Sequence, residues 1–223
     1  MLPQLLKDLN ELDGVEWIRV MYLYPNNFND ELIEAFATLD KVCKYIDIPL
    51  QHASDTLLSS MNRYDTKAEV EALLTKLRAR IPEIVIRTTF IVGFPGETDE
   101  DFEQTMKIAQ QIKYINSYSF KYSPRPHTAA ALMPDQIPES TKAARLARLD
   151  TYLNEVQREF NESCIDKTLQ CLLEGPDKTG KHLVYRTPFM QQCIVPSVDN
   201  APELANITIT SANKASLRGK FSD

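Results

Sequence analysis

Residues 1–165 alternate between stretches with the helical spacing of apolar residues and short apolar stretches that are typical of β-strands. Aromatic and β-branched residues predict four strands, at 17–24, 45–50, 85–93 and 115–122. The segment 85–93 (VIRTTFIVG) is nearly continuously apolar, which is typical of a strand buried on both faces of a parallel sheet. Repeated strand-then-helix units favour an α/β fold with right-handed crossovers.

Helices are predicted between these strands, where residues suited to begin a helix precede apolar residues at helical spacing. Leucines at that spacing predict a helix over 2–12, which Gly14 ends. The further helices begin at Asn29, Asp55, Thr66, Thr98 and Pro138, and the last runs to about Cys164. Four strands cannot close an eight-stranded barrel, which needs roughly 200 residues or more. We therefore expect an open sheet or part of a larger barrel, and a helix before the first strand favours the second.

The pattern changes after Asp166, where short β-rich segments are separated by Gly, Pro, Asn and Asp. The predicted strands lie at 168–174, 182–185, 191–195 and 206–210. Short strands of this kind suit a small antiparallel barrel of the OB-like type. We therefore predict two domains, a partial barrel of parallel strands at residues 1–165 and a small β-barrel at 166–223.

The formal net charge of −6 argues against a nucleic-acid-binding protein, because such domains are usually basic. The charge is unevenly distributed, however. Residues 166–223 carry seven Lys and Arg against six Asp and Glu, a net charge of about +1, so the remainder carries about −7. If RNA is a partner, the C-terminal segment is the expected contact.

No apolar stretch approaches the roughly 20 residues that cross a bilayer, and no signal peptide is recognisable, so we predict a cytoplasmic protein. The spacing of the four cysteines excludes zinc-ribbon, thioredoxin and local iron–sulfur motifs. We expect free thiols that pack as small apolar groups, at Cys43, Cys164, Cys171 and Cys193. The sequence therefore predicts no metal ligands.

The segment FIVGFPGE, residues 90–97, ends the most apolar predicted strand and opens a helix. At the carboxyl edge of a parallel sheet such a turn faces the ligand crevice. Gly93 and Gly96 would allow the backbone to approach a flat ligand closely. A Gly-Pro-Gly turn is about as likely to serve simple chain reversal as to face a ligand, so this motif alone leaves both interpretations open.

A second polar segment, residues 48–55 (IPLQHASD), follows the preceding strand at the same predicted edge. It presents Gln51, His52 and Ser54, although Ser54 or Asp55 could simply cap the next helix. Two such segments on successive strands favour a shared site, in which we expect His52 to orient neighbouring groups by hydrogen bonding rather than to transfer protons.

Lys121 and Arg125 lie near the end of the last predicted strand of the sheet, in the segment YSFKYSPRP, residues 118–126. At that edge they could contact a phosphate or a carboxylate. A solvated loop with two ordinary surface cations is the alternative.

Several long motifs, in order, resemble the methylthiotransferase family of radical-SAM enzymes. They are IPLQHASD at 48–55, MNR at 61–63, RTTFIVGFPGETDEDF at 87–102 and YSFKYSPRPHTAA at 118–130. The segments YRTPFMQ, residues 185–191, and SLRGK, residues 216–220, are similar to the family's terminal TRAM domain. The resemblance extends over nearly the whole chain.

The resemblance implies a reaction that attaches a methylthio group at an unactivated C–H bond, with S-adenosylmethionine and 4Fe–4S clusters as cofactors. The residues that it implies for S-adenosylmethionine binding are Gln51, His52, Ser54, Gly93, Pro95, Gly96 and Glu97. The residues that we expect to contact RNA or another substrate are Lys121, Arg125, Arg186, Lys214, Arg218 and Lys220.

The chain departs from the family pattern in two ways. The family's C-x-x-x-C-x-x-C motif is absent, as are the N-terminal domain and early barrel strands, so we expect this chain alone to hold no cluster and to be inactive. His127 stands where the tRNA-modifying branch usually has glycine, so the local turn could differ.

Two substrates are consistent with the resemblance, and a third interpretation remains open. The first half looks like enzymes that modify a ribosomal-protein aspartate. From Tyr118 onward the sequence looks like enzymes that modify the isopentenylated adenosine beside the tRNA anticodon, which we favour because the TRAM domain contacts the substrate. The remaining alternative is a non-catalytic RNA-binding fragment.

Overall fold

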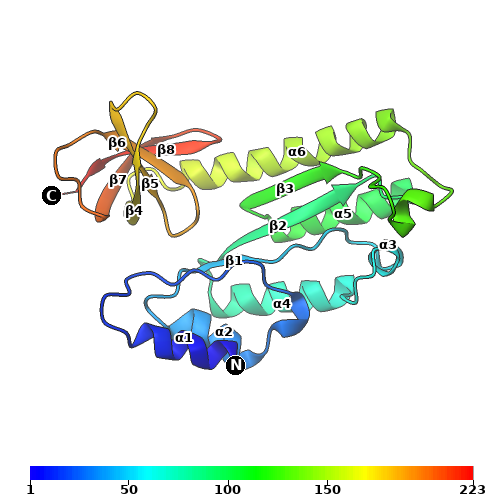
Figure 1. The fold of residues 1–223 in the computed structure, drawn as a ribbon, viewed down its shortest axis with the longest axis horizontal. Coiled ribbons are helices and arrows are strands. Elements are labelled where there is room, and N and C mark those ends of the chain that lie inside the picture. The colour runs from blue at the N-terminus through cyan, green and yellow to red at the C-terminus, as the bar shows by residue number, and fades with distance from the viewer. Residues whose placement is uncertain (223) are drawn as a thin grey trace. The chain divides into compact units, whose positions relative to one another are not determined.

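The computed structural model describes residues 1–222 and shows two compact units, Met1–Leu153 and Asn154–Asp223. The division lies within one long helix, α6 (Glu139–Glu162), whereas the change of sequence pattern lies just after its end. Within the described residues, no helix is both long enough and apolar enough to cross a membrane. Figure 1 shows the course of the chain through both units.

The first unit contains a three-stranded parallel sheet, as the sequence predicts. Its strands are β1 (Tyr45–Asp47), β2 (Val85–Val92) and β3 (Asn116–Lys121), in the order β1-β2-β3. The segments that connect them contain helices, so that strand and helix alternate along the chain (Figure 1). The partial parallel barrel expected from the sequence therefore takes the form of an open sheet.

The helices of this unit begin where the sequence predicts. They are α1 (Leu2–Asn10), α2 (Asp30–Thr38), α3 (Asp55–Ser60), α4 (Lys67–Arg80) and α5 (Asp99–Ile112), with short 3₁₀ turns η1 (Pro25–Asn27) and η2 (Ala129–Leu132). Asn29 caps α2 by accepting the Leu32 N–H, and Thr66 and Thr98 form reciprocal capping boxes. These caps satisfy backbone donors that a helix leaves unpaired at its N-terminus.

The prediction of a strand at residues 17–24 is wrong. Towards the sheet, this segment makes one isolated bridge, between Ile18 and Val42, and a backbone bond to β1, from the Leu23 N–H to the Asp47 carbonyl at 2.8 Å. Tyr22, between them, has a φ of 57°, a left-handed conformation that interrupts an extended chain. The apolar pattern therefore reports burial here but not a continuous ladder.

The two faces of the sheet differ in burial. Ile86, Phe90 and Val92 belong to the core, together with buried residues of α4 and α5 such as Leu77 and Ile108. On the opposite face, Tyr118 and Phe120 of β3 are 52% and 54% exposed. Arg87 lies on that face, pairs with Asp47 at 2.5 Å and places its guanidinium 4.9 Å from the Tyr118 ring centroid. One face is thus a core, whereas the other is buried around Asp47 and Arg87 and exposed at Tyr118 and Phe120 of β3.

The second unit is a closed five-stranded barrel. Its strands are β4 (Thr168–Pro176), β5 (His182–Arg186), β6 (Gln192–Pro196), β7 (Leu204–Ala212) and β8 (Ser216–Phe221), closing in the order β4-β5-β6-β8-β7. The predicted small barrel is confirmed, but two details are wrong. Four strands were predicted rather than five, and β6 pairs with β8 in parallel rather than antiparallel fashion.

The missed strand, β8, has a weak local pattern because its inward positions include a glycine. Leu217 and Gly219 point inward and are buried, while Arg218 and Lys220 are exposed. A side chain at position 219 would collide with Ile207 and with the Thr208 carbonyl, so only glycine fits at this contact. The four cysteines are free and buried, and Cys171 and Cys193 belong to the barrel core.

Candidate functional site

The carboxyl ends of β1 and β2 form the edge of the sheet where the site is expected. Past the end of β1, the Gln51 N–H donates to the Thr89 carbonyl at 2.8 Å, and the Gln51 carbonyl accepts from the Ile91 N–H at 2.8 Å. Gln51 adopts a φ of 73°, which turns the chain immediately after this pairing. The structure thus brings the two polar segments, residues 48–55 and 90–97, side by side.

A buried network of hydrogen bonds joins the two segments. His52 Nε2 lies 3.1 Å from Glu97 Oε1, and His52 Nδ1 accepts the Ser54 N–H at 3.0 Å. The Glu97 carboxylate also accepts the Gly93 N–H. Since His52, Ser54 and Glu97 are all buried, these residues hold the edge together and do not themselves offer a surface to a ligand. His52 is thus held by hydrogen bonds on both ring nitrogens, and an orienting role for it stays a prediction.

The turn from Gly93 to Glu97 depends on left-handed backbone at both glycines. Gly93 has a φ of 74° and Gly96 a φ of 83°. At Gly93 a side chain would also collide with the methylenes of Lys142, so the close approach here is to a helix of the same unit. Pro95 is buried, and the Gly96 N–H donates to the Asp135 carbonyl at 2.8 Å.

A cavity of about 910 Å³ opens at this edge. Its lining combines apolar side chains, Ile91 and Phe94 among them, with polar groups such as Gln51 and Thr89. This mixture of apolar walls and a few polar groups is typical of small-molecule sites. Of the seven residues expected to bind S-adenosylmethionine, Gln51 lines the cavity; His52, Ser54 and Glu97 are buried in the network described above.

Lys121, the last residue of β3, and Arg125 in the loop that follows also line the cavity. Lys121 forms an ion pair with Glu139. Arg125 is exposed on the loop that follows. Within the described residues the lining of the cavity thus has three basic side chains, Arg63, Lys121 and Arg125.

Arg63 is a cavity residue that sequence reasoning did not single out individually. Its guanidinium donates to the Pro49 carbonyl at 2.8 Å and to Asp65 Oδ2 at 3.1 Å, and it lies 4.9 Å from the Tyr24 ring centroid. A single arginine in a loop carries no local signal of such contacts. Only its place in the motif MNR pointed to it.

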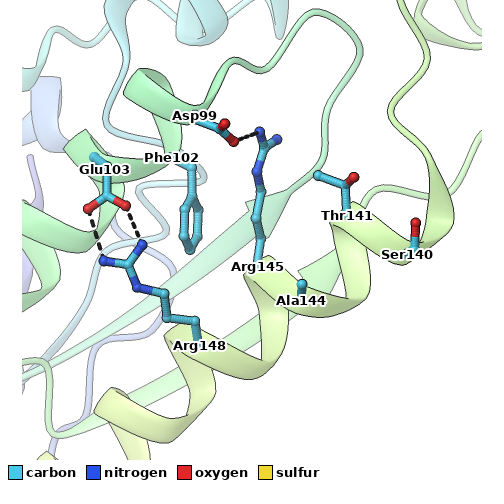
Figure 2. A pocket seen from close by; sticks show the side chains of 8 residues that line it. All are labelled: Asp99, Phe102, Glu103, Ser140, Thr141, Ala144, Arg145 and Arg148. Carbon is cyan, nitrogen blue, oxygen red and sulfur yellow. Dashed lines mark hydrogen bonds and ion pairs between the residues drawn. The ribbon is translucent and has the colours of Figure 1, made fainter.

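Arg145 was also missed, although it completes the buried network. It lies on α6, and its Nη1 donates to Glu97 Oε2 at 2.8 Å and to the Glu97 carbonyl at 3.1 Å. Its Nη2 donates to Asp99 Oδ1 at 2.7 Å (Figure 2). Burial lowers the pKa of this guanidinium, but the carboxylates of Asp99 and Glu97 outweigh burial and raise it. In the sequence Arg145 is one charge among many on a long helix.

The basic residues of the second unit differ in how freely they can contact a partner. Arg186 forms a two-point ion pair with Glu174, at 2.8 and 2.7 Å, so its charge is already engaged. Lys214, Arg218 and Lys220 are exposed. Arg218 and Lys220 lie two positions apart on β8, where successive residues point alternately inward and outward. Both therefore lie on the same outer face of the barrel.

The described residues do not supply ligands for an iron–sulfur cluster. No group of three or more His, Cys, Asp or Glu side chains among them is placed to hold a metal ion. The cysteines are buried, and burial raises the pKa of the Cys43 and Cys164 thiols, which disfavours the thiolate form that binds iron. The chemistry of the donor set therefore does not fit a cluster.

Sequence comparison relates this architecture to a known superfamily. Residues 1–109 match the model of the radical SAM superfamily. The fold is similar to that of coproporphyrinogen III oxidase (HemN) from Escherichia coli, a radical SAM enzyme, with a TM-score of 0.56 and 19% identity over 72% of this chain and 38% of that one. The parallel sheet with its strand-end cavity is therefore a radical SAM fold.

The relatives narrow the class further. Ribosomal protein uS12 methylthiotransferase RimO from Alkaliphilus oremlandii is 38% identical over 100% of this chain and 49% of its own length. The tRNA-2-methylthio-N(6)-dimethylallyladenosine synthase from Maricaulis maris is 41% identical over 99% and 48%. The chain is similar over nearly its whole length to methylthiotransferases of these two kinds, and it spans about half the length of the curated relatives it matches. The family implies S-adenosylmethionine and a 4Fe–4S cluster as cofactors.

Proposed function

We propose that this chain forms one wall of the S-adenosylmethionine pocket in a methylthiotransferase that modifies the isopentenylated adenosine beside the tRNA anticodon. The observation that carries the proposal is the cavity of about 910 Å³ at the ends of the parallel strands, in a chain 38–41% identical to methylthiotransferases. Ligands of open α/β sheets bind at the carboxyl ends of the strands.

The residues of the cavity fit a nucleoside-like cofactor. Ile91 and Phe94 offer apolar surface to a flat base, and the Gln51 side chain offers an amide donor and acceptor. When bound, S-adenosylmethionine would supply the adenosyl group that removes hydrogen from the substrate. The chain's own part is to hold this cofactor and to keep water from it. Ligands for a cluster are not among the described residues.

We favour tRNA as the substrate because the barrel presents exposed Arg218 and Lys220 on one face. We propose that the barrel acts as the TRAM-like, RNA-contacting part. The alternative substrate is the ribosomal protein uS12, which a relative 38% identical over the whole chain supports. A non-catalytic RNA-binding fragment is the remaining alternative.

The proposal is tested by calorimetric titration of the full chain with S-adenosylhomocysteine, a stable analogue of the cofactor. Gln51→Asn shortens the amide and suits the left-handed backbone at this position, so affinity should fall roughly tenfold through loss of a hydrogen bond. The exposed Gln111→Asn substitution on α5 is the control. Equal affinity of the parent and the Gln51 variant would argue against this pocket.

Substrate choice needs a separate measurement. Binding of the chain to an isopentenylated anticodon stem-loop is compared with binding to uS12. Preference for the stem-loop supports tRNA, and preference for uS12 supports the alternative. Binding to RNA without any binding of S-adenosylhomocysteine would favour the non-catalytic interpretation.

A further inference from the structure

Arg145 neutralises a carboxylate that is otherwise enclosed in the first unit. The Glu97 side chain is 0% exposed and the Arg145 side chain 8% exposed. A buried carboxylate is costly unless a cation and hydrogen bonds compensate it. Among the described residues, the Glu97 carboxylate meets the Gly93 N–H, His52 and Arg145, and Arg145 supplies the permanent positive charge.

The hydrogen-bond directions around His52 follow from these contacts. His52 Nδ1 accepts the Ser54 N–H, so the proton of the neutral ring lies on Nε2 and is donated to Glu97 Oε1. Glu97 therefore fixes both the His52 ring and the Gly93 amide. Any displacement of its carboxylate would act on both strand-end segments that border the cavity.

Arg148, three residues further along α6, has a different environment. It forms a two-point ion pair with Glu103 on α5, but it is 53% exposed and makes no contact with Glu97. Figure 2 shows both arginines beside Phe102 in a groove of about 590 Å³ between α5 and α6. The two residues have the same side chain, lie on the same helix and both pair with α5; they differ in burial and in the link from Arg145 to Glu97.

We propose that Arg145 is a positioning residue, which through Glu97 holds the Gly93–Glu97 turn and the His52 ring in the arrangement that shapes the cofactor cavity. The link to a cofactor rests on the proposed function. The effect on the turn and on the His52 ring does not, because it concerns the fold of this chain alone.

The first test uses NMR on the full chain and its Arg145→Gln variant. The Gly93 amide should exchange with solvent roughly 10- to 100-fold faster, the range expected for a hydrogen bond to a charged group. The ring-nitrogen shifts of His52 should change as its bond to Glu97 is disturbed. Arg148→Gln, the matched control, should alter neither signal, although it removes an equal charge.

Chemical rescue separates positioning from general damage to the fold. The groove gives solvent access to the site of Arg145, so free guanidinium at millimolar concentration should restore Gly93 protection in Arg145→Ala, whereas sodium should not. Arg145→Lys, which keeps the charge but lacks the planar fork of two guanidinium nitrogens, should give intermediate protection and covers the case in which the other variants fail to fold. Parent-like Gly93 exchange and His52 shifts in a folded Arg145 variant would overturn the proposal.

A second readout addresses the cofactor. Binding of S-adenosylhomocysteine should weaken at least tenfold in Arg145→Gln and remain unchanged in Arg148→Gln. If the parent chain binds no S-adenosylhomocysteine, the proposed pocket fails, while the NMR readouts still decide the role of Arg145. If the parent binds and both arginine variants bind equally well, the positioning role in the cavity is wrong.

Discussion

At the scale of single residues, backbone conformation explains a departure that the sequence only flagged. His127, at the position where the resemblance to the tRNA-modifying branch implies glycine, has a φ of 66°. This left-handed conformation is one that glycine adopts most readily, and the imidazole is exposed on the turn.

Tyr114 gives a prediction at the same scale. Its hydroxyl is buried without a hydrogen-bond partner among the described residues, while its ring packs edge-on against Phe90 with centroids 5.5 Å apart. Because an unsatisfied buried group destabilises the fold, Tyr114→Phe should raise the free energy of unfolding by about 1 kcal/mol at neutral pH. Urea denaturation measures this, with the exposed Tyr64→Phe as a control that should shift stability little.

The same residue predicts a dependence on alkaline pH. Burial raises the pKa of Tyr114 above its ordinary value of 10.0, so the folded chain keeps a proton that the unfolded chain loses. The contribution of this retained proton to the free energy of unfolding is fully present below pH 10 and is lost as pH rises further. Stability of the parent should therefore fall more steeply above pH 10 than that of Tyr114→Phe. Identical slopes would contradict the assignment.

At the scale of elements, the turn between β4 and β5 illustrates how one carboxylate organises a hairpin. Asp177 accepts hydrogen bonds from the Thr179 N–H at 3.1 Å and from the Thr179 hydroxyl at 2.9 Å, and its Oδ2 lies 3.2 Å from His182 Nδ1. Desolvation acts to raise the pKa of Asp177, but these hydrogen bonds prevail and lower it to about 2.

This shift predicts acid-dependent loosening of the hairpin. Since the folded-state pKa lies below the ordinary value of 3.8, the stabilisation is present above about pH 4 and is lost as pH falls towards 2. The Thr179 and His182 amides should exchange faster at pH 2.5 than at pH 5 after correction for intrinsic rates. In Asp177→Asn this extra dependence should disappear, whereas the exposed Asp199→Asn variant should retain it.

At the scale of the whole molecule, the two units carry separate parts of the proposed function. The first provides the strand-end cavity, and the second provides the exposed cations of β8. The charge difference between the N-terminal and C-terminal sequence agrees with this division: the basic surplus lies in the barrel segment.

RNA binding is the prediction at this scale. We expect the chain to bind an anticodon stem-loop with a Kd of roughly 10⁻⁴ to 10⁻⁶ M, because few phosphate contacts are available. Arg218→Ala with Lys220→Ala should weaken binding and lower the slope of log affinity against log salt by roughly 1 to 2. Filter binding across a salt series measures both. Lys178→Ala with Lys181→Ala, on the β4–β5 turn, is the matched control. Equal effects of the two double substitutions would contradict RNA binding through the face of β8.

The sequence by itself determined the local features of this protein. Helix starts at Asn29, Thr66 and Thr98 depend on side-chain oxygens that bond backbone amides within three residues, so they are legible in short segments. The same holds for the buried strand β2 and for the two segments at the sheet edge. Long motifs in order were enough to indicate the family.

Only the tertiary structure decided which distant residues meet. Arg145 pairs with Glu97 across 48 positions, and no periodicity or motif relates the two. The stretch around Tyr22 is apolar like a strand but is interrupted by left-handed backbone, and β8 joins its barrel through a parallel pairing that local pattern does not encode. The physical reason is common to all three: side-chain pattern reports burial and local hydrogen bonding, whereas partner choice depends on packing of the whole chain.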